Sequence, residues 1–141
     1  MEFNPYLNFN GQCAAAFKFY EQCFGGTITF MQTFGESPMK DQVPADWQDK
    51  IMHTTLTVGT RTLMGADAPP TQYAVPQGIT VSISIADPAE AERIFTALAD
   101  GGNIGMPFQK TFWSQGFGMA VDRFGIPWMV NCEQAASPAS V

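Results

Sequence analysis

LNFNGQCAAAFKFYEQCFGGTI (residues 7–28) and ISIADPAEAERIFTALADGGNI (residues 83–104) are the two stretches that decide the fold, because they are copies of one pattern. Each copy contains a short β-like run, a helix, a double glycine and another β-like run. The chain therefore repeats itself once. In the alignment Phe9 falls on Ile85, Ala15 on Ala91, Phe19 on Phe95, and Gly25-Gly26 on Gly101-Gly102.

Three strand candidates follow each helix. They are Thr27–Phe34, Ile51–Val58 and Arg61–Gly65 in the first copy, and Asn103–Lys110, Phe117–Val121 and Pro127–Cys132 in the second. The order βαβββ, twice, leaves one sheet face covered by a helix and the other open. We therefore expect an α+β fold of two tandem βαβββ modules that form a curved mixed sheet with a concave cleft.

The helix ends carry recognisable signals. Asp87 can cap the second helix, Pro88 suits its first position, and Glu90 completes a capping-box pattern. Gly25 can adopt the left-handed conformation that ends the first helix.

We expect one domain over residues 1–134, with repeats at about 1–66 and 78–134 joined by residues 67–77. Residues 35–49 are polar and contain two prolines. They predict a long loop over the mouth of the cleft, with Trp47 near its end. Residues 135–141 are small and polar, which predicts a flexible tail.

Composition limits the possible partners. The 141 residues carry a net charge of −6 with only 7 Lys and Arg, which argues against nucleic acid. Residues 1–9 lack a signal-peptide pattern and no long apolar run is present, so we expect neither secretion nor a membrane span. Three widely spaced cysteines indicate reduced thiols rather than a disulfide framework. We expect a cytoplasmic protein.

Alternation along two strands predicts which side chains face the cleft. In residues 79–85 Ile79, Val81, Ile83 and Ile85 would face the helix, and Thr80, Ser82 and Ser84 would face the concave side. In Ile51–Val58 the same reasoning sends Met52, Leu56 and Val58 to the helix and His53, Thr55 and Thr57 to the cleft.

The protein's only histidine, His53, would thus lie among threonines in the cleft. Histidine side chains generally titrate near neutrality, so it is the candidate general base. The alternative is a structural histidine bonded to a neighbouring hydroxyl or carbonyl. A single imidazole cannot form a metal site without further ligands.

Four segments together carry a resemblance to a known family: PYLNFNG, AAAFKFYEQCFGG, IMHTTLTVG and DRFGIPWMVNCE. In this order they resemble PhnB-like proteins of the vicinal oxygen chelate (glyoxalase and bleomycin-resistance) superfamily, a group sometimes labelled 3-demethylubiquinone 3-methyltransferase. The most specific part is the closing pattern of Asp122, Phe124-Gly125 and Trp128. The resemblance implies paired βαβββ modules and a homodimer.

In metal-dependent relatives the resemblance also implies a divalent ion held by His or Glu residues. Carried over by the helix and the closing glycine, those positions fall on Pro5, Thr80 and Met129, with a further position near Met64. None of these side chains binds a hard cation. We therefore expect no metal and no other cofactor. Methyl transfer is not indicated either, because the Gly101–Gly105 run follows a helix rather than opening one.

Three functions remain open. The first is a small-molecule binding protein of the bleomycin-resistance type, whose candidate ligand-binding residues are Trp47, Thr55, Thr57, Thr80, Ser82 and Met129. The second is a glyoxalase-like lyase, isomerase or dioxygenase, either metal-dependent through atypical ligands or metal-free with His53 as base. The third is an assembly protein with a vestigial cleft.

Overall fold

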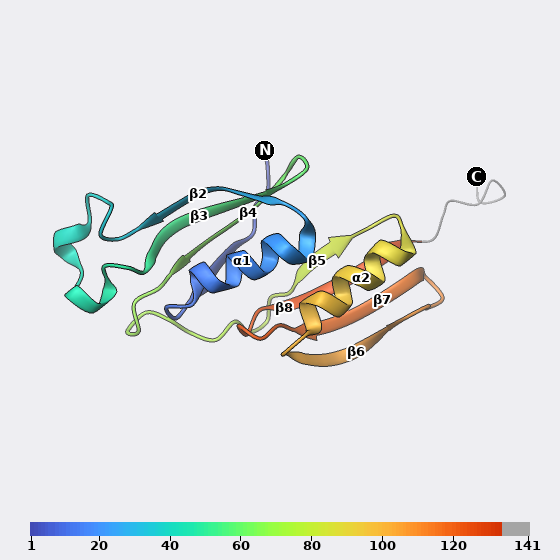
Figure 1. Ribbon diagram of the computed structural model, residues 1–141. Helices are drawn as coiled ribbons and strands as arrows, with labels where there is room; N and C mark the ends of the chain where they lie inside the picture. Colours follow the sequence, from blue (N-terminus) through green and yellow to red (C-terminus); the bar gives the residue numbers. More distant parts are fainter. Residues whose placement is uncertain (134–141) are drawn as a thin grey trace. The chain divides into compact units, whose positions relative to one another are not determined.

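The computed structural model describes residues 1–133, which divide into two compact units. The first unit is Met1–Val75 and the second begins at Pro76. Each unit contains one four-stranded mixed sheet and one long helix (Figure 1). The α+β fold of tandem βαβββ modules is therefore confirmed, with the eight strands in two sheets, one for each repeat. The tail expected at residues 135–141 lies outside the described residues.

The first unit runs from β1 to β4. Its elements are β1 (Tyr6–Phe9), α1 (Cys13–Phe24), β2 (Thr27–Thr33), the short 3-10 helices η1 (Lys40–Gln42) and η2 (Ala45–Trp47), β3 (Ile51–Val58) and β4 (Arg61–Asp67). The sheet order is β1-β4-β3-β2. Strand β1 pairs in parallel with β4, and the other pairs are antiparallel.

The second unit repeats this arrangement. Its elements are β5 (Val81–Ser84), α2 (Pro88–Ala99), β6 (Asn103–Gln109), β7 (Ser114–Val121) and β8 (Pro127–Glu133). The sheet order is β5-β8-β7-β6, with β5 parallel to β8 and the remaining pairs antiparallel. Within residues 1–133 no helix is long and apolar enough to cross a membrane.

The helix signals read from the sequence act largely as expected. The Asp87 carboxylate accepts a hydrogen bond from the Ala89 N–H at 3.3 Å, and Pro88 is the first helical residue. The Glu90 carboxylate accepts a hydrogen bond from Nε of Arg93, one turn later in the helix, at 2.9 Å. Gly25 ends α1 with a φ of +71°, a conformation that favours glycine.

Two details of the repeat differ from the sequence alignment. Tyr20, not Phe19, is the fully buried helix residue that corresponds to Phe95. The reason is that α1 and α2 are offset by one residue fewer than the strands on either side of them, β1 and β5 before the helices and β2 and β6 after them. Ile79 is 74% exposed instead of facing the helix. The reason is that β5 begins at Val81, so Ile79 and Thr80 precede the strand.

Candidate functional site

Strand β3 separates core side chains from open-face side chains. Thr54 and Leu56 are fully buried on the side of α1. His53, Thr55 and Thr57 are only partly buried and lie on the opposite side, where no helix covers the sheet. The predicted alternation of this strand is therefore found in the structure, and it places the histidine on the open face of the first unit.

His53 lies in a cluster of hydroxyls and aromatic rings. Its Nδ1 is 3.0 Å from the Tyr6 hydroxyl, and its Nε2 is 3.2 Å from Thr55 Oγ1. The Tyr6 ring stacks on the imidazole with centroids 5.6 Å apart, and the Phe30 ring lies 5.9 Å away. Strands β1, β2 and β3 thus each contribute a side chain to one cluster.

The phenol of Tyr6 stays protonated at neutral pH. Its pKa is raised, chiefly by burial and secondarily by the nearby Cys13. A phenol that donates to Nδ1 of His53 leaves the ring proton on Nε2, from where it can reach Thr55 Oγ1. Both ring nitrogens are then engaged, so His53 would have to give up one hydrogen bond before it could accept a proton from a substrate.

Sequence reasoning found His53 and Thr55 but missed Tyr6 and Phe30. The signal that could have found Tyr6 was the internal repeat. Tyr6 pairs with Met64 in the first sheet as Ser82 pairs with Met129 in the second, so Tyr6 and Ser82 are equivalent positions. Because Ser82 was predicted to face the cleft, the same prediction should have been made for Tyr6. Thr57, the other predicted threonine, lies further along β3 and its hydroxyl is 3.3 Å from that of Thr29.

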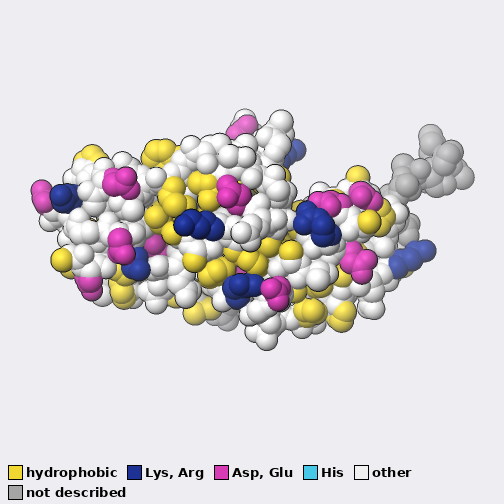
Figure 2. Space-filling view, in the orientation of Figure 1, with side chains coloured by type: hydrophobic (Ala, Val, Ile, Leu, Met, Phe, Trp, Pro, Cys, Tyr) yellow, Lys and Arg dark blue, Asp and Glu magenta, His cyan; other side chains and the backbone are white. Residues whose placement is uncertain are grey.

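On the open face of each sheet, one residue from each of the four strands lies beside the next and forms a row across the sheet. Ser82 pairs with Met129, Met129 with Met119, and Met119 with Met106. In the first unit the matching row is Tyr6, Met64, Thr55 and Phe30. Among the described residues, neither row contains Lys, Arg, Asp or Glu. Charged groups are spread over the helix-bearing side seen in Figure 2, where no histidine is visible. Each row is thus neutral, in a protein with a net charge of −6.

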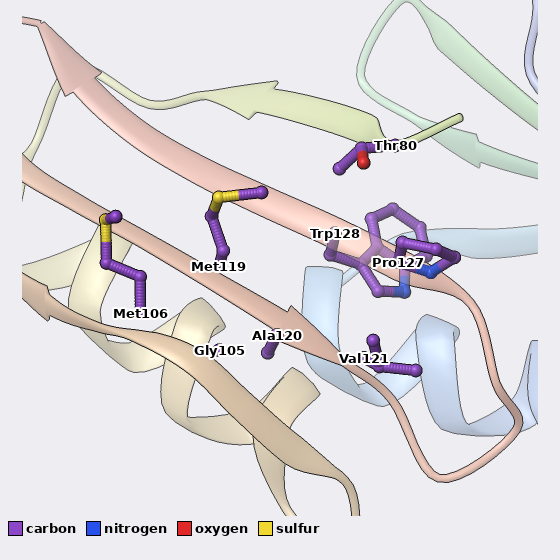
Figure 3. A pocket seen from close by; sticks show the side chains of 8 residues that line it. All are labelled: Thr80, Gly105, Met106, Met119, Ala120, Val121, Pro127 and Trp128. Atoms are coloured by element: carbon purple, nitrogen blue, oxygen red, sulfur yellow. The ribbon is translucent and has the colours of Figure 1, made fainter. Parts of the chain in front are cut away.

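A pocket of about 240 Å³ opens in the second unit (Figure 3). Thr80, from the segment just before β5, supplies a hydroxyl at its edge. The other predicted residues of this unit, Ser82 and Met129, lie on the same sheet but do not line the pocket. Residues that do line it include Thr80, Gly105, Met106, Met119, Val121 and Pro127.

Trp47 belongs to the long loop and not to either sheet. It is the last residue of η2, and its indole N–H is buried without a hydrogen-bond acceptor in the described part of the chain. The loop is closed at its base by hydrogen bonds from Phe34 N to Lys50 O and from Gly35 N to Gln48 O. The structure does not bring Trp47 into the His53 cluster.

Strand pairing tests whether the residues at the transferred metal-ligand positions lie opposite one another in each sheet. Met64 pairs with Tyr6 rather than Pro5, and Met129 pairs with Ser82 rather than Thr80. A phenol, a hydroxyl and two thioethers do not fit a hard divalent cation. Within residues 1–133 no three His, Cys, Asp or Glu side chains lie close enough together to share a metal ion.

The closing motif of the sequence has a structural role. The buried Asp122 carboxylate accepts hydrogen bonds from Phe124 N at 2.8 Å, Ile126 N at 3.0 Å and Trp128 Nε1 at 2.8 Å. Gly125, with a φ of +91°, completes this turn between β7 and β8. The motif therefore fixes the hairpin and marks the fold rather than a reaction.

Comparison with known proteins identifies the family. Residues 1–131 match the model of the family described as 3-demethylubiquinone-9 3-methyltransferase. Protein YjdN of Escherichia coli K12 is 34% identical over 93% of this chain and 95% of its own length. The crystal structure of protein PA1353 from Pseudomonas aeruginosa is 50% identical, covers 96% of this chain and 99% of that one, and has a TM-score of 0.85.

More distant structures show the same fold. The PhnB protein from Bacillus cereus is 21% identical over 94% of this chain and 99% of its own, with a TM-score of 0.77. A glyoxalase/bleomycin resistance protein/dioxygenase family enzyme from Burkholderia phytofirmans is 11% identical over 93% and 97%, with a TM-score of 0.62. The family resemblance seen in the sequence is confirmed: the chain belongs to the family described as 3-demethylubiquinone-9 3-methyltransferase. It also shares its fold with the PhnB protein and with the glyoxalase/bleomycin resistance protein/dioxygenase family enzyme.

Proposed function

We propose that this protein binds a small molecule, as a protein of the glyoxalase/bleomycin-resistance type, in a cleft of a homodimer and without the usual metal site. The observation that carries the proposal is the His53 cluster on an uncharged open sheet face. Imidazole, phenol and hydroxyl groups can bond a polar ligand, and the rings of Tyr6 and Phe30 can contact a flat one. Tyr6 and Phe30 are 44% and 46% exposed, so both rings are accessible.

The homodimer is proposed because the second unit exposes large apolar side chains. Phe112 is 90% exposed and contacts the ring of Trp113, which in turn contacts Phe117. Ile104 on the edge strand β6 is also exposed. Exposed apolar groups of this size next to a sheet edge favour a protein partner.

The family's name describes methyl transfer, which we do not propose for this chain. Gly101 and Gly102 follow α2, and Gly101 has a φ of +77°, so this glycine run ends a helix. A nucleotide-binding glycine loop instead leads from a strand into a helix.

One observation favours a second candidate, a metal-free lyase or isomerase with His53 as general base. The imidazole lies on an open face and is only partly buried, so a substrate could reach it. Catalysis would require a ligand to replace Tyr6 or Thr55 as the partner of one ring nitrogen.

The His53→Ala variant tests the proposal and separates it from the second candidate. Uncharged aromatic amides and phenols would be screened by thermal shift, and the tightest would be titrated into wild type, His53→Ala and the helix-face control Lys18→Ala. Loss of a ligand hydrogen bond should weaken binding about tenfold in His53→Ala only. The free energy of unfolding should fall by only about 1 kcal/mol, because the side chain is outside the core.

Unchanged affinity in His53→Ala, together with a large loss of stability, would show that the histidine is structural. Turnover of the bound compound that His53→Ala abolishes without changing its affinity would favour the enzyme instead.

A further inference from the structure

Gly105 in β6 is a glycine that neither backbone conformation nor packing requires. It lies at an irregularity in the pairing with β7, between Ile104 and Met106. The matching irregularity of the first unit, between Ile28 and Phe30, contains Thr29, so it does not require a glycine. Its φ is outside the left-handed region, and an added Cβ would meet only the Met119 carbonyl oxygen, at 3.8 Å, an ordinary contact. In β7 the situation is different. A Cβ at Gly116 would clash with the Phe108 ring, and one at Gly118 would lie 2.7 Å from the Phe95 ring. Those two glycines are explained by packing, and Gly105 is not.

The missing side chain at Gly105 opens space for a ligand. Gly105 lines the pocket of about 240 Å³ together with Met106 and Met119, whose side chains project beside it in Figure 3. A glycine within a strand weakens the strand, and such a glycine often marks a place where a ligand approaches the backbone. An ordinary β-forming residue here would fill part of the pocket.

The chemistry of the pocket limits what it can hold. Its side chains are apolar except for Thr80, which supplies one hydroxyl. An ionised ligand would lose solvation there without finding an opposite charge. The thioethers of Met106 and Met119 are flexible and polarisable, and they pack well against aromatic rings.

We propose that this pocket binds an uncharged aromatic molecule of one or two rings with a single hydrogen-bonding group, and that Gly105 sets the size it accepts. An apolar cavity of about 150 Å³ is enough for benzene. A volume of about 240 Å³ therefore suits a substituted or bicyclic ring. This inference goes beyond the proposed function, because the pocket lies in the second unit and the His53 cluster lies in the first.

The test uses indole and its isostere indene, which lacks the N–H group. Each would be titrated into the full-length protein and followed by ligand-observed NMR. Gly105→Leu should weaken indole binding at least tenfold, whereas Gly105→Ala should change it less than threefold. Ser84→Leu places the same leucine side chain on the open face outside the pocket and should have no effect. Thr80→Val should weaken indole several-fold and leave indene unchanged.

Two outcomes would overturn the inference, provided that circular dichroism shows both proteins folded. The first is that Gly105→Leu binds indole as tightly as the wild type does, and the second is that neither the wild type nor Gly105→Leu binds indole. A wild type that binds indole-2-carboxylate as tightly as indole would also overturn it. Because the pocket and the His53 cluster lie in different units, the two proposals fail separately. Indole binding that Gly105→Leu does not weaken refutes only this pocket, and ligand binding that His53→Ala does not weaken refutes only the proposed role of the His53 cluster.

Discussion

Replacing Asp122 by alanine should be among the most damaging single changes in the second unit. The carboxylate is 3% exposed and accepts three hydrogen bonds, two from backbone N–H groups of the β7–β8 turn and one from the indole of Trp128. Removing it leaves three donors, at least two of them buried, without this acceptor. A buried polar group without a partner costs about 1–3 kcal/mol. We therefore expect a loss of about 3–6 kcal/mol, a large share of the 5–15 kcal/mol typical of a domain.

Urea denaturation followed by tryptophan fluorescence and circular dichroism would measure this loss. Asp87→Ala is the matched control, because it removes an aspartate of the same unit that makes one exposed cap hydrogen bond. That change should cost only about 1 kcal/mol. A loss below about 1 kcal/mol for Asp122→Ala, or one no larger than that of Asp87→Ala, would refute the structural role assigned to the closing motif.

Two further predictions follow from the first unit. Burial, with a smaller effect of Asp67, raises the pKa of the Cys13 thiol in the folded protein. The protonated thiol therefore contributes its full share of the free energy of unfolding below the pKa of an unfolded cysteine, and this share is lost as the pH rises above that value. From pH 7 to pH 10 wild type should lose about 2 kcal/mol more than Cys13→Ala in urea unfolding, and equal losses would contradict this account. The loop of residues 35–49 should move when a ligand binds, so titration should change the tryptophan fluorescence of the wild type, and Trp47→Phe should remove that change. If every ligand that binds gives the same fluorescence change in Trp47→Phe as in the wild type, the loop is not a lid.

The sequence was sufficient to predict the fold because its repeat carries several independent signals. The strand Ile51–Val58 was predicted to the residue, since its alternation and the flanking turn agree. The strand proposed from Ile79 was too long, because alternation alone does not show where pairing with β8 begins. Asp122 was recognised as specific, but its role emerged only from its three hydrogen bonds.

The candidate site was harder to predict, because its residues come from different strands. His53 and Thr55 are two residues apart in one strand and therefore point to the same face of the sheet, so the alternation of that strand was sufficient to predict that they lie together. Tyr6 and Phe30 reach His53 only through the pairing of β1 with β4 and of β2 with β3. The pocket beside Gly105 is defined by an absent side chain, and no sequence pattern shows whether a glycine is needed for its backbone or for the space it leaves.

Native mass spectrometry of protein purified without chelator tests the central claim most directly, because it measures the subunit number, bound metal and bound organic ligand together. We predict a species of twice the 15.4 kDa chain mass with no metal increment. Any co-purified organic mass should be reduced in His53→Ala. A monomer, or a stoichiometric increment of zinc, nickel, manganese or iron, would contradict the account of a metal-free binding protein that works as a homodimer.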